Sequence, residues 1–159
     1  MPHLQLDVPN RYPLSVKRDL AGRLGRHYAE IMQTSADLVH VTFRELGEGG
    51  VWHCTAGEPV TPAAVLSCDI RRGRPAEQRA RLGEALLNAC VEALGLDPFL
   101  MTVEFTQHAG DEIYGKILVD GVAQGGLAKD WSPAETQSPL METLRSEARA
   151  NHGLSRDIG

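Results

Sequence analysis

The fold is decided by the stretch His3-Leu4-Gln5-Leu6-Asp7-Val8, in which apolar and polar residues alternate as they do in a half-buried strand. A turn rich in proline follows over residues 9–13. Apolar residues and one histidine then recur on one side of a helix, at Val16, Leu20, Leu24, His27 and Ile31. Residues 38–45 alternate again, which completes a predicted strand–helix–strand unit.

The same unit recurs 62 residues later without a gap. Nine positions are identical in this single register: Leu4/Leu66, Asp7/Asp69, Pro13/Pro75, Leu20/Leu82, Leu24/Leu86, Glu30/Glu92, Leu38/Leu100, Val41/Val103 and Phe43/Phe105. Shared strand and helix composition alone does not explain so many identities, so we infer a duplicated unit. The second copy is expected as a strand over 64–71, a helix over 75–94 and a strand over 99–107.

Right-handed crossovers make each strand pair parallel and place its helix on one face. We therefore expect an α/β (α+β) fold in which two fused βαβ units form a four-stranded mixed sheet with two helices on one face. The starts of the first and third strands are expected to be neighbours. The other face is expected to carry apolar side chains that are buried against other subunits.

A single domain is expected over residues 1–120, with repeats at about 2–53 and 64–115, followed by an extension over 121–159. Residues 46–63 contain four glycines and are expected to form a hairpin and linker between the copies. We also expect a short hairpin over 111–119 and a polar helix over 138–150.

Composition excludes several classes of protein. The net charge of −5 argues against nucleic acid or an anionic membrane as the main partner. There is no apolar run of the ~18 residues that a membrane span needs, and the start of the chain does not read as a targeting peptide. Three widely spaced cysteines fit reduced thiols in a cytoplasmic protein, with Cys68 and Cys90 in the core. The histidines lack metal-site spacing, so we expect no metal.

Pro2 directly follows Met1. If Met1 is removed, Pro2 becomes the amino terminus and its nitrogen is a secondary amine. Burial and nearby cations lower the pKa of an amine toward the range in which it acts as a base at neutral pH. The structural alternative is a proline at the first position of a strand, where its missing N–H does no harm. The matching residue in the second copy is Ala64, so the fold does not require proline there.

Arg71 and Arg74 precede Pro75 at the start of the second helix. Cations at a helix N-terminus oppose the helix dipole, and structure alone favours Ser, Asp or Asn there. Together with the N–H groups of that turn, the two arginines indicate an anion site. The alternative is a solvated basic turn. Their counterparts in the first copy are Pro9 and Tyr12, so the amine belongs to one copy and the arginines to the other.

These features together resemble the tautomerase superfamily. The run Gly73-Arg74-Pro75-Ala76-Glu77-Gln78-Arg79 is similar to the Gly-Arg-Ser-x-Glu-Gln-Lys run of 4-oxalocrotonate tautomerases. The fused halves and the extension resemble the cis-3-chloroacrylic acid dehalogenase group most. The resemblance covers about residues 1–115. It implies a homotrimer without metal or cofactor, in which Pro2 is the acid or base beside a small carboxylate held by Arg71 and Arg74.

The chain departs from the dehalogenase pattern at three places. Tyr28, with His27 beside it, aligns with the histidine of the dehalogenases, and Glu104 stands where they carry a tyrosine. Ile113 replaces their water-activating glutamate before Tyr114-Gly115. We expect His27 in the core, Tyr28 as a cavity wall flanking the apolar stripe, and Glu104 in solvent or facing a cavity.

The leading functional hypothesis is a cytoplasmic tautomerase that acts on a small 2-oxo or enol carboxylate. Hydration or dehalogenation of a 3-substituted acrylate, and decarboxylation of a 3-oxo acid, are the enzymatic alternatives. A non-catalytic oligomer that binds an acidic metabolite is the alternative from another class.

Overall fold

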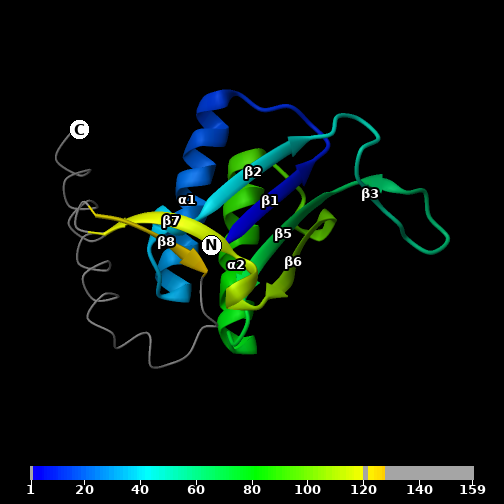
Figure 1. Cartoon of the computed structure of the whole chain (residues 1–159). Coiled ribbons are helices and arrows are strands. Elements are labelled where there is room, and N and C mark those ends of the chain that lie inside the picture. The colour runs from blue at the N-terminus through cyan, green and yellow to red at the C-terminus, as the bar shows by residue number, and fades with distance from the viewer. Residues whose placement is uncertain (1, 120–121, 128–159) are drawn as a thin grey trace.

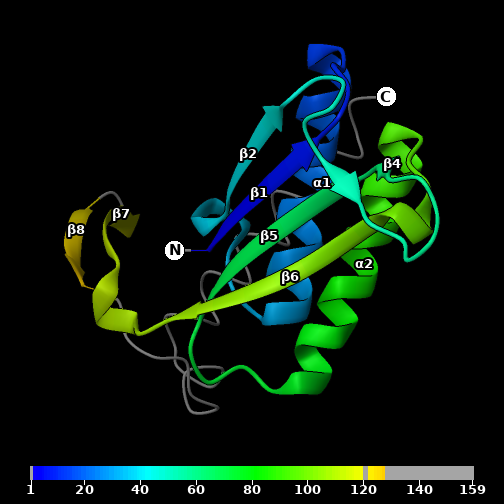
Figure 2. The same ribbon diagram turned by 90° about the vertical axis from the view of Figure 1, so that its right-hand side faces the viewer.

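The computed structural model describes residues 2–119 and 122–127, in which a four-stranded mixed sheet carries both long helices on the same face (Figures 1 and 2). The first unit comprises β1 (His3–Val8), α1 (Leu14–Met32), the 3-10 turn η1 (Ala36–Leu38) and β2 (His40–Glu45). The second comprises β5 (Ala64–Arg71), α2 (Ala76–Leu94), η2 (Pro98–Leu100) and β6 (Met101–His108). The predicted fold class is confirmed.

The strand order in the sheet is β2-β1-β5-β6. β1 is parallel to β2, and β5 is parallel to β6, as predicted. The two units join through an antiparallel pairing of β1 with β5, in which His3 lies opposite Asp69 and Asp7 opposite Val65. The expectation that the starts of the first and third strands are neighbours is therefore wrong. Antiparallel pairing places the start of β1 beside the end of β5.

The structure reproduces the duplication, and the match is residue for residue in the long helices. Each long helix has 19 residues, and α2 begins and ends 62 positions after α1. Pro13 and Pro75, predicted as the first helical residues, are the N-cap residues, so each helix begins one position later than predicted. The N–H of Lys17 donates to the Pro13 carbonyl and the N–H of Arg79 to the Pro75 carbonyl, both at 3.1 Å.

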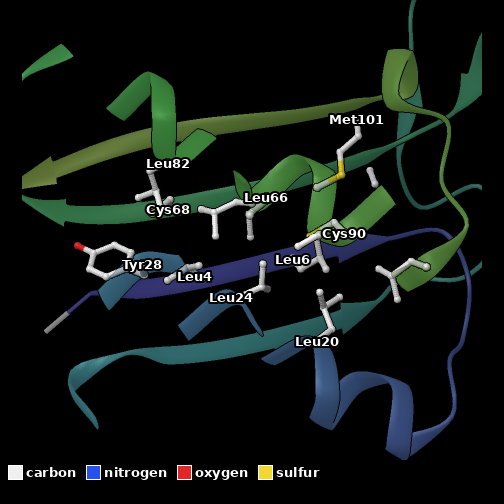
Figure 3. Packing of buried hydrophobic residues seen from close by; sticks show 14 of the residues in the cluster. Leu4, Leu6, Leu20, Leu24, Tyr28, Leu66, Cys68, Leu82, Cys90 and Met101 are labelled. Carbon is white, nitrogen blue, oxygen red and sulfur yellow. The ribbon is translucent and has the colours of Figure 1, made fainter. Parts of the chain in front are cut away.

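The core lies between the helices and the sheet (Figure 3). α1 buries Leu20, Leu24, Tyr28 and Met32, which recur every four residues. Tyr28 is therefore a core residue and His27 is only half-buried, so the expectation that His27 lies on the buried stripe with Tyr28 at its flank is wrong. Cys68 and Cys90 lie in this core, as expected, and burial raises the pKa of each thiol to about 12.

The sheet face that the helices leave uncovered is polar, which corrects the expectation of an apolar face. Hydrogen bonds join its strands, because Arg44 donates to both carboxylate oxygens of Asp7 and the Ser67 hydroxyl donates to Glu104 at 2.5 Å. The residues of this face are His3, Gln5 and Asp7 of β1, His40, Thr42 and Arg44 of β2, Val65, Ser67, Asp69 and Arg71 of β5, and Thr102, Glu104, Thr106 and His108 of β6. Cross-strand polar pairs stabilise such a face without burial.

Each unit ends in a hairpin, at opposite ends of the sheet (Figures 1 and 2). Between the copies, β3 (Trp52–His53) pairs with β4 (Thr61–Pro62) in a projecting arm, as expected for residues 46–63. After β6 and the 3-10 turn η3 (Gly110–Glu112), β7 (Tyr114–Val119) pairs with β8 (Val122–Leu127). The hairpin expected over 111–119 thus has its second strand beyond that range.

The expected polar helix over 138–150, and the extension beyond Leu127, lie outside the described residues. Among the residues that are described, no helix is both long and apolar enough to cross a bilayer.

A carboxylate joins the two ends of the first unit. Glu45, the last residue of β2, accepts the backbone N–H of Tyr12 at 2.7 Å and the Lys17 ammonium at 3.1 Å. The Tyr12 hydrogen bond, followed by that of Lys17, lowers the pKa of Glu45 below its ordinary value. The strand end is thereby fixed to the start of α1.

We expect the contribution of Glu45 to stability to vanish in acid. Because the pKa of Glu45 is lower in the folded chain than in the unfolded chain, its contribution is complete above the unfolded value of about 4.5 and falls as the pH drops through the folded value. Urea midpoints of the wild type and Glu45→Gln should therefore differ at pH 7 and converge well below pH 4.5. A gap that stays constant with pH would contradict this role.

Gln33 at the end of α1 predicts a stabilising substitution. It adopts a left-handed conformation with φ 53°, whereas the matching residue of α2 is Gly95 with φ 63°. Glycine reaches this conformation without the steric cost of a Cβ, so Gln33→Gly should raise the free energy of unfolding by about 0.5–1 kcal/mol. Gly95→Ala is the matched control and should lower it by about 1 kcal/mol. Urea unfolding of both variants measures the two changes.

Candidate functional site

Pro2 lies at the point where β1 begins and β5 ends. It is buried, and its carbonyl accepts the His40 N–H at 3.1 Å, which extends the pairing of β1 with β2 by one residue. One step beyond the pair His3–Asp69, the antiparallel register places Pro2 opposite Ile70, the residue before Arg71. The two units thus bring together the proline and the first arginine that the sequence singled out.

Arg74 has a structural contact that the sequence analysis missed. Its side chain is only 5% exposed and donates a hydrogen bond to the carbonyl of Met32, the last residue of α1. The Gln78 amide donates to the neighbouring carbonyl of Ile31 at 2.7 Å. The last turn of α1 contains no basic residue of its own, so these side chains from the start of α2 bind its terminal carbonyls. Arg74 is therefore not a solvated surface arginine.

Tyr28 joins Arg71 and Arg74 at this end of the sheet. Its ring lies in the core beside Leu4, and its hydroxyl points toward the end where β1 begins and β5 finishes (Figure 3). Burial raises the pKa of Tyr28 above its ordinary value, with a smaller contribution in the same direction from Cys68, while the positive charges of Arg74 and Arg71 lower it. The net effect keeps the hydroxyl neutral, so it can donate a hydrogen bond at physiological pH.

A second polar cluster lies at the same end, on the uncovered face. His108 is 9% exposed, and its Nδ1 lies 2.8 Å from Oδ2 of Asp69, an ion-pair distance without hydrogen-bond alignment. Thr106 donates to the other oxygen of Asp69 at 2.8 Å. In the β5–β6 register His108 lies opposite Arg71. Sequence reasoning missed Asp69 and His108 because only strand pairing makes them neighbours.

The remaining candidates lie elsewhere or on another face. His27 is half-buried on α1. Glu104 is exposed on the uncovered face, hydrogen-bonded to Ser67 near the middle of the sheet. Tyr114 is 64% exposed at the start of β7. The β7–β8 hairpin itself lies at the same end of the sheet as the start of β1 (Figures 1 and 2).

The arrangement combines groups suited to acid–base chemistry on an anion. Guanidinium groups bind carboxylates, a neutral phenol donates a hydrogen bond, and an amino-terminal proline nitrogen would exchange a proton. Within residues 2–119 and 122–127, no three His, Cys, Asp or Glu side chains gather as they do in a metal site.

Several solved structures have the same fold as this chain. The chain is similar to N1, a member of the cis-3-chloroacrylic acid dehalogenase (cis-CaaD) family, with a TM-score of 0.63 and 21% identity over 91% of this chain and 99% of N1. It is also similar to the Q0 fused 4-OT, a symmetric trimer, with a TM-score of 0.62 and 21% identity over 79% of this chain and 94% of that one.

Pt0534, solved after inactivation by 2-oxo-3-pentynoate, matches with a TM-score of 0.61 and 21% identity over 79% of this chain and 94% of that one. No protein-family model and no curated protein matches the sequence. The matched solved structures show that the chain has the fold of tautomerase-superfamily structures, as the resemblance implied.

The contact of Arg74 with Met32 predicts that replacing Arg74 destabilises the fold more than replacing the exposed Arg72. Arg74→Met removes a buried charged donor and should lower the free energy of unfolding by about 1–3 kcal/mol. Arg72→Met changes an exposed side chain two residues earlier in the chain, and its effect should be about 0.5 kcal/mol or less. Urea unfolding measures the change in the free energy of unfolding for each of the two variants. Equal losses would contradict the structural role of Arg74.

Proposed function

We propose that the chain is a cofactor-independent tautomerase that uses the amino-terminal nitrogen of Pro2 as its acid and base. The observation that carries this proposal is the antiparallel pairing of β1 with β5, which sets Pro2 beside the strand end that carries Arg71. Arg74 and the Tyr28 hydroxyl lie at the same end. The fold shared with N1 and the fused 4-OT supports the proposal.

The proposed substrate is a small 2-oxo carboxylate or its enol. Arg71 and Arg74 would bind the carboxylate and stabilise the negative charge that spreads toward it as the enol proton leaves. Pro2 would take the proton from the enol oxygen and deliver it to the carbon at the other end of the enol double bond. The O–H bond breaks, the C=C pair forms the new C–H bond, and the carbonyl forms without a second reactant. The neutral Tyr28 hydroxyl would donate a hydrogen bond to the developing carbonyl oxygen.

We also propose that the chain acts as a homotrimer in the cytoplasm, built from one domain over residues 1–120. The Q0, R7 and F6 fused 4-OT structures are trimers, which supports assembly of this chain in the same way. The polar uncovered face does not itself require a partner, so the support comes from the shared fold rather than from exposed apolar surface.

Replacing the proline tests the mechanism directly. Pro2→Ala replaces the secondary amine with a primary amine in a more mobile chain end, and we expect ketonisation of phenylenolpyruvate to slow by about 100-fold or more. Gln5→Ala, on the uncovered face of the same strand, is the control and should keep the wild-type rate. Equal rates for the wild type and Pro2→Ala would reject the proline mechanism.

Mass spectrometry of the intact chain supplies an independent check. We expect a mass without Met1, since only then does Pro2 carry a free secondary amine. A chain that retains Met1 would favour the alternative of a non-catalytic protein that binds an acidic metabolite.

A further inference from the structure

The internal repeat shows how the fold pairs the carboxylate that the two units have in common. Asp7 and Asp69 occupy the same position of the repeat, on the uncovered face of β1 and β5. In the first unit Arg44 donates to both carboxylate oxygens of Asp7, at 2.6 and 2.5 Å. One cross-strand arginine is therefore enough to pair this carboxylate.

The second unit divides the role of that arginine between two residues. Thr106 stands in the place of Arg44, and its hydroxyl donates to Oδ1 of Asp69 at 2.8 Å. His108 stands in the place of Leu46, and its Nδ1 lies 2.8 Å from Oδ2 of the same carboxylate. The repeated geometry does not require an imidazole at this position, because the first unit is built with a leucine there.

The second ring nitrogen of His108 is the atom that this pairing leaves over. His108 is only 9% exposed, and within residues 2–119 and 122–127 its Nε2 is buried and makes no hydrogen bond. Since Nδ1 faces the carboxylate of Asp69, Nε2 points away from that carboxylate. A buried polar atom without a partner costs free energy, which a ligand group at this atom would recover.

Arg71 is the direct neighbour of His108 on the same face of the sheet. The two residues are opposite each other in the parallel register, and each is the last residue of its strand. Neighbouring strands lie about 4.8 Å apart, so a carboxylate on Arg71 is within reach of the imidazole. Burial is the main cause of the raised pKa of Tyr28, and the charges of Arg71 and Asp69 shift it in opposite directions, so both charges lie close to the candidate site.

We propose that His108 binds the ligand carboxylate together with Arg71, and that its ring takes up a proton as the carboxylate binds. The Nδ1–H of the imidazolium then faces Asp69, and the Nε2–H donates to a carboxylate oxygen of the ligand. The positive ring lies between two carboxylates that would otherwise repel each other. The proton comes from solvent, and no covalent bond of the ligand changes. This deepens the proposed function, on which it rests for the choice of a carboxylate as ligand.

Other groups near His108 also carry charge or exchange protons. They are Asp69, Arg71 and Arg72 of β5 and the turn after it, His3 of β1, and Asp111 and Glu112 of η3. Histidines and amino-terminal amines in general exchange protons near neutral pH, so the pH dependence of the wild type alone does not report on one residue. The variants below keep all of these groups, and the difference between wild type and variant therefore isolates His108.

The first test compares 3-phenylpropanoate with 3-phenylpropanamide, which lacks the charge. By calorimetric titration of the full chain between about pH 6 and about pH 8.5, the affinity for 3-phenylpropanoate should fall about 10-fold more in the wild type than in His108→Asn, while the affinity for the amide changes little in both. His108→Asn keeps a donor for Asp69 and removes Nε2. Thr102→Ala, exposed on the same face of the same strand, is the control and should behave as the wild type. The same pH dependence in the wild type and His108→Asn would overturn the proposal.

The second test rebuilds the arrangement of the first unit in the second. Thr106→Arg combined with His108→Leu supplies the residues found around Asp7, so the double variant should keep the wild-type urea midpoint. Its affinity for 3-phenylpropanoate should show the reduced pH dependence of His108→Asn. The pH dependence is the readout because the added cation changes the affinity at every pH. A double variant with the full pH dependence of the wild type would overturn the proposal.

Failure of this inference and failure of the proposed function are distinguishable, because binding is measured without turnover. Proton-coupled binding that is lost in the His108 variants, while Pro2→Ala keeps the full ketonisation rate, would reject the proline mechanism alone. Equal pH dependence in the wild type and His108→Asn, with a slow Pro2→Ala, would reject the role of His108 alone.

Discussion

The antiparallel pairing of β1 with β5 is the contact on which the rest of the structure depends. Each βαβ unit has one helix and two parallel strands, too little to enclose a core alone, and the pairing joins the two half-cores into one. The same pairing turns one unit end for end relative to the other. The start of β1 therefore lies beside the end of β5, and a residue from each repeat contributes to the candidate site.

The two halves have diverged in charge while keeping their geometry. The first unit binds its own carboxylate, Glu45, at the start of α1, whereas the second carries arginines at and around the start of α2. Arg74 has a structural role beside its proposed binding role, because it donates to the terminal carbonyl of α1 while its charge lowers the pKa of Tyr28. A site built in this way couples its geometry to the packing of both helices.

Much of the fold was predictable because strands and helices are encoded locally. Alternation identified β1 with its observed bounds, and the 62-residue register located both helices to within one residue. The apolar stripe of α1 was assigned less well. Each residue turns a helix by about 100°, so His27 and Tyr28 both lie near the edge of the stripe, and only packing against β1 and β5 decided that Tyr28 is buried.

The sequence by itself determined the duplication, the parallel pairs, and the choice of Pro2, Arg71 and Arg74 as candidate residues. Only the tertiary structure decided that β1 and β5 run antiparallel, that the uncovered face is polar and cross-paired, and that Asp69 and His108 are neighbours. The physical reason is that these contacts join residues that are far apart along the chain. Periodicity reports which side of an element is apolar, but strand partners and side-chain contacts depend on residues far apart in the chain, which meet only when the core closes.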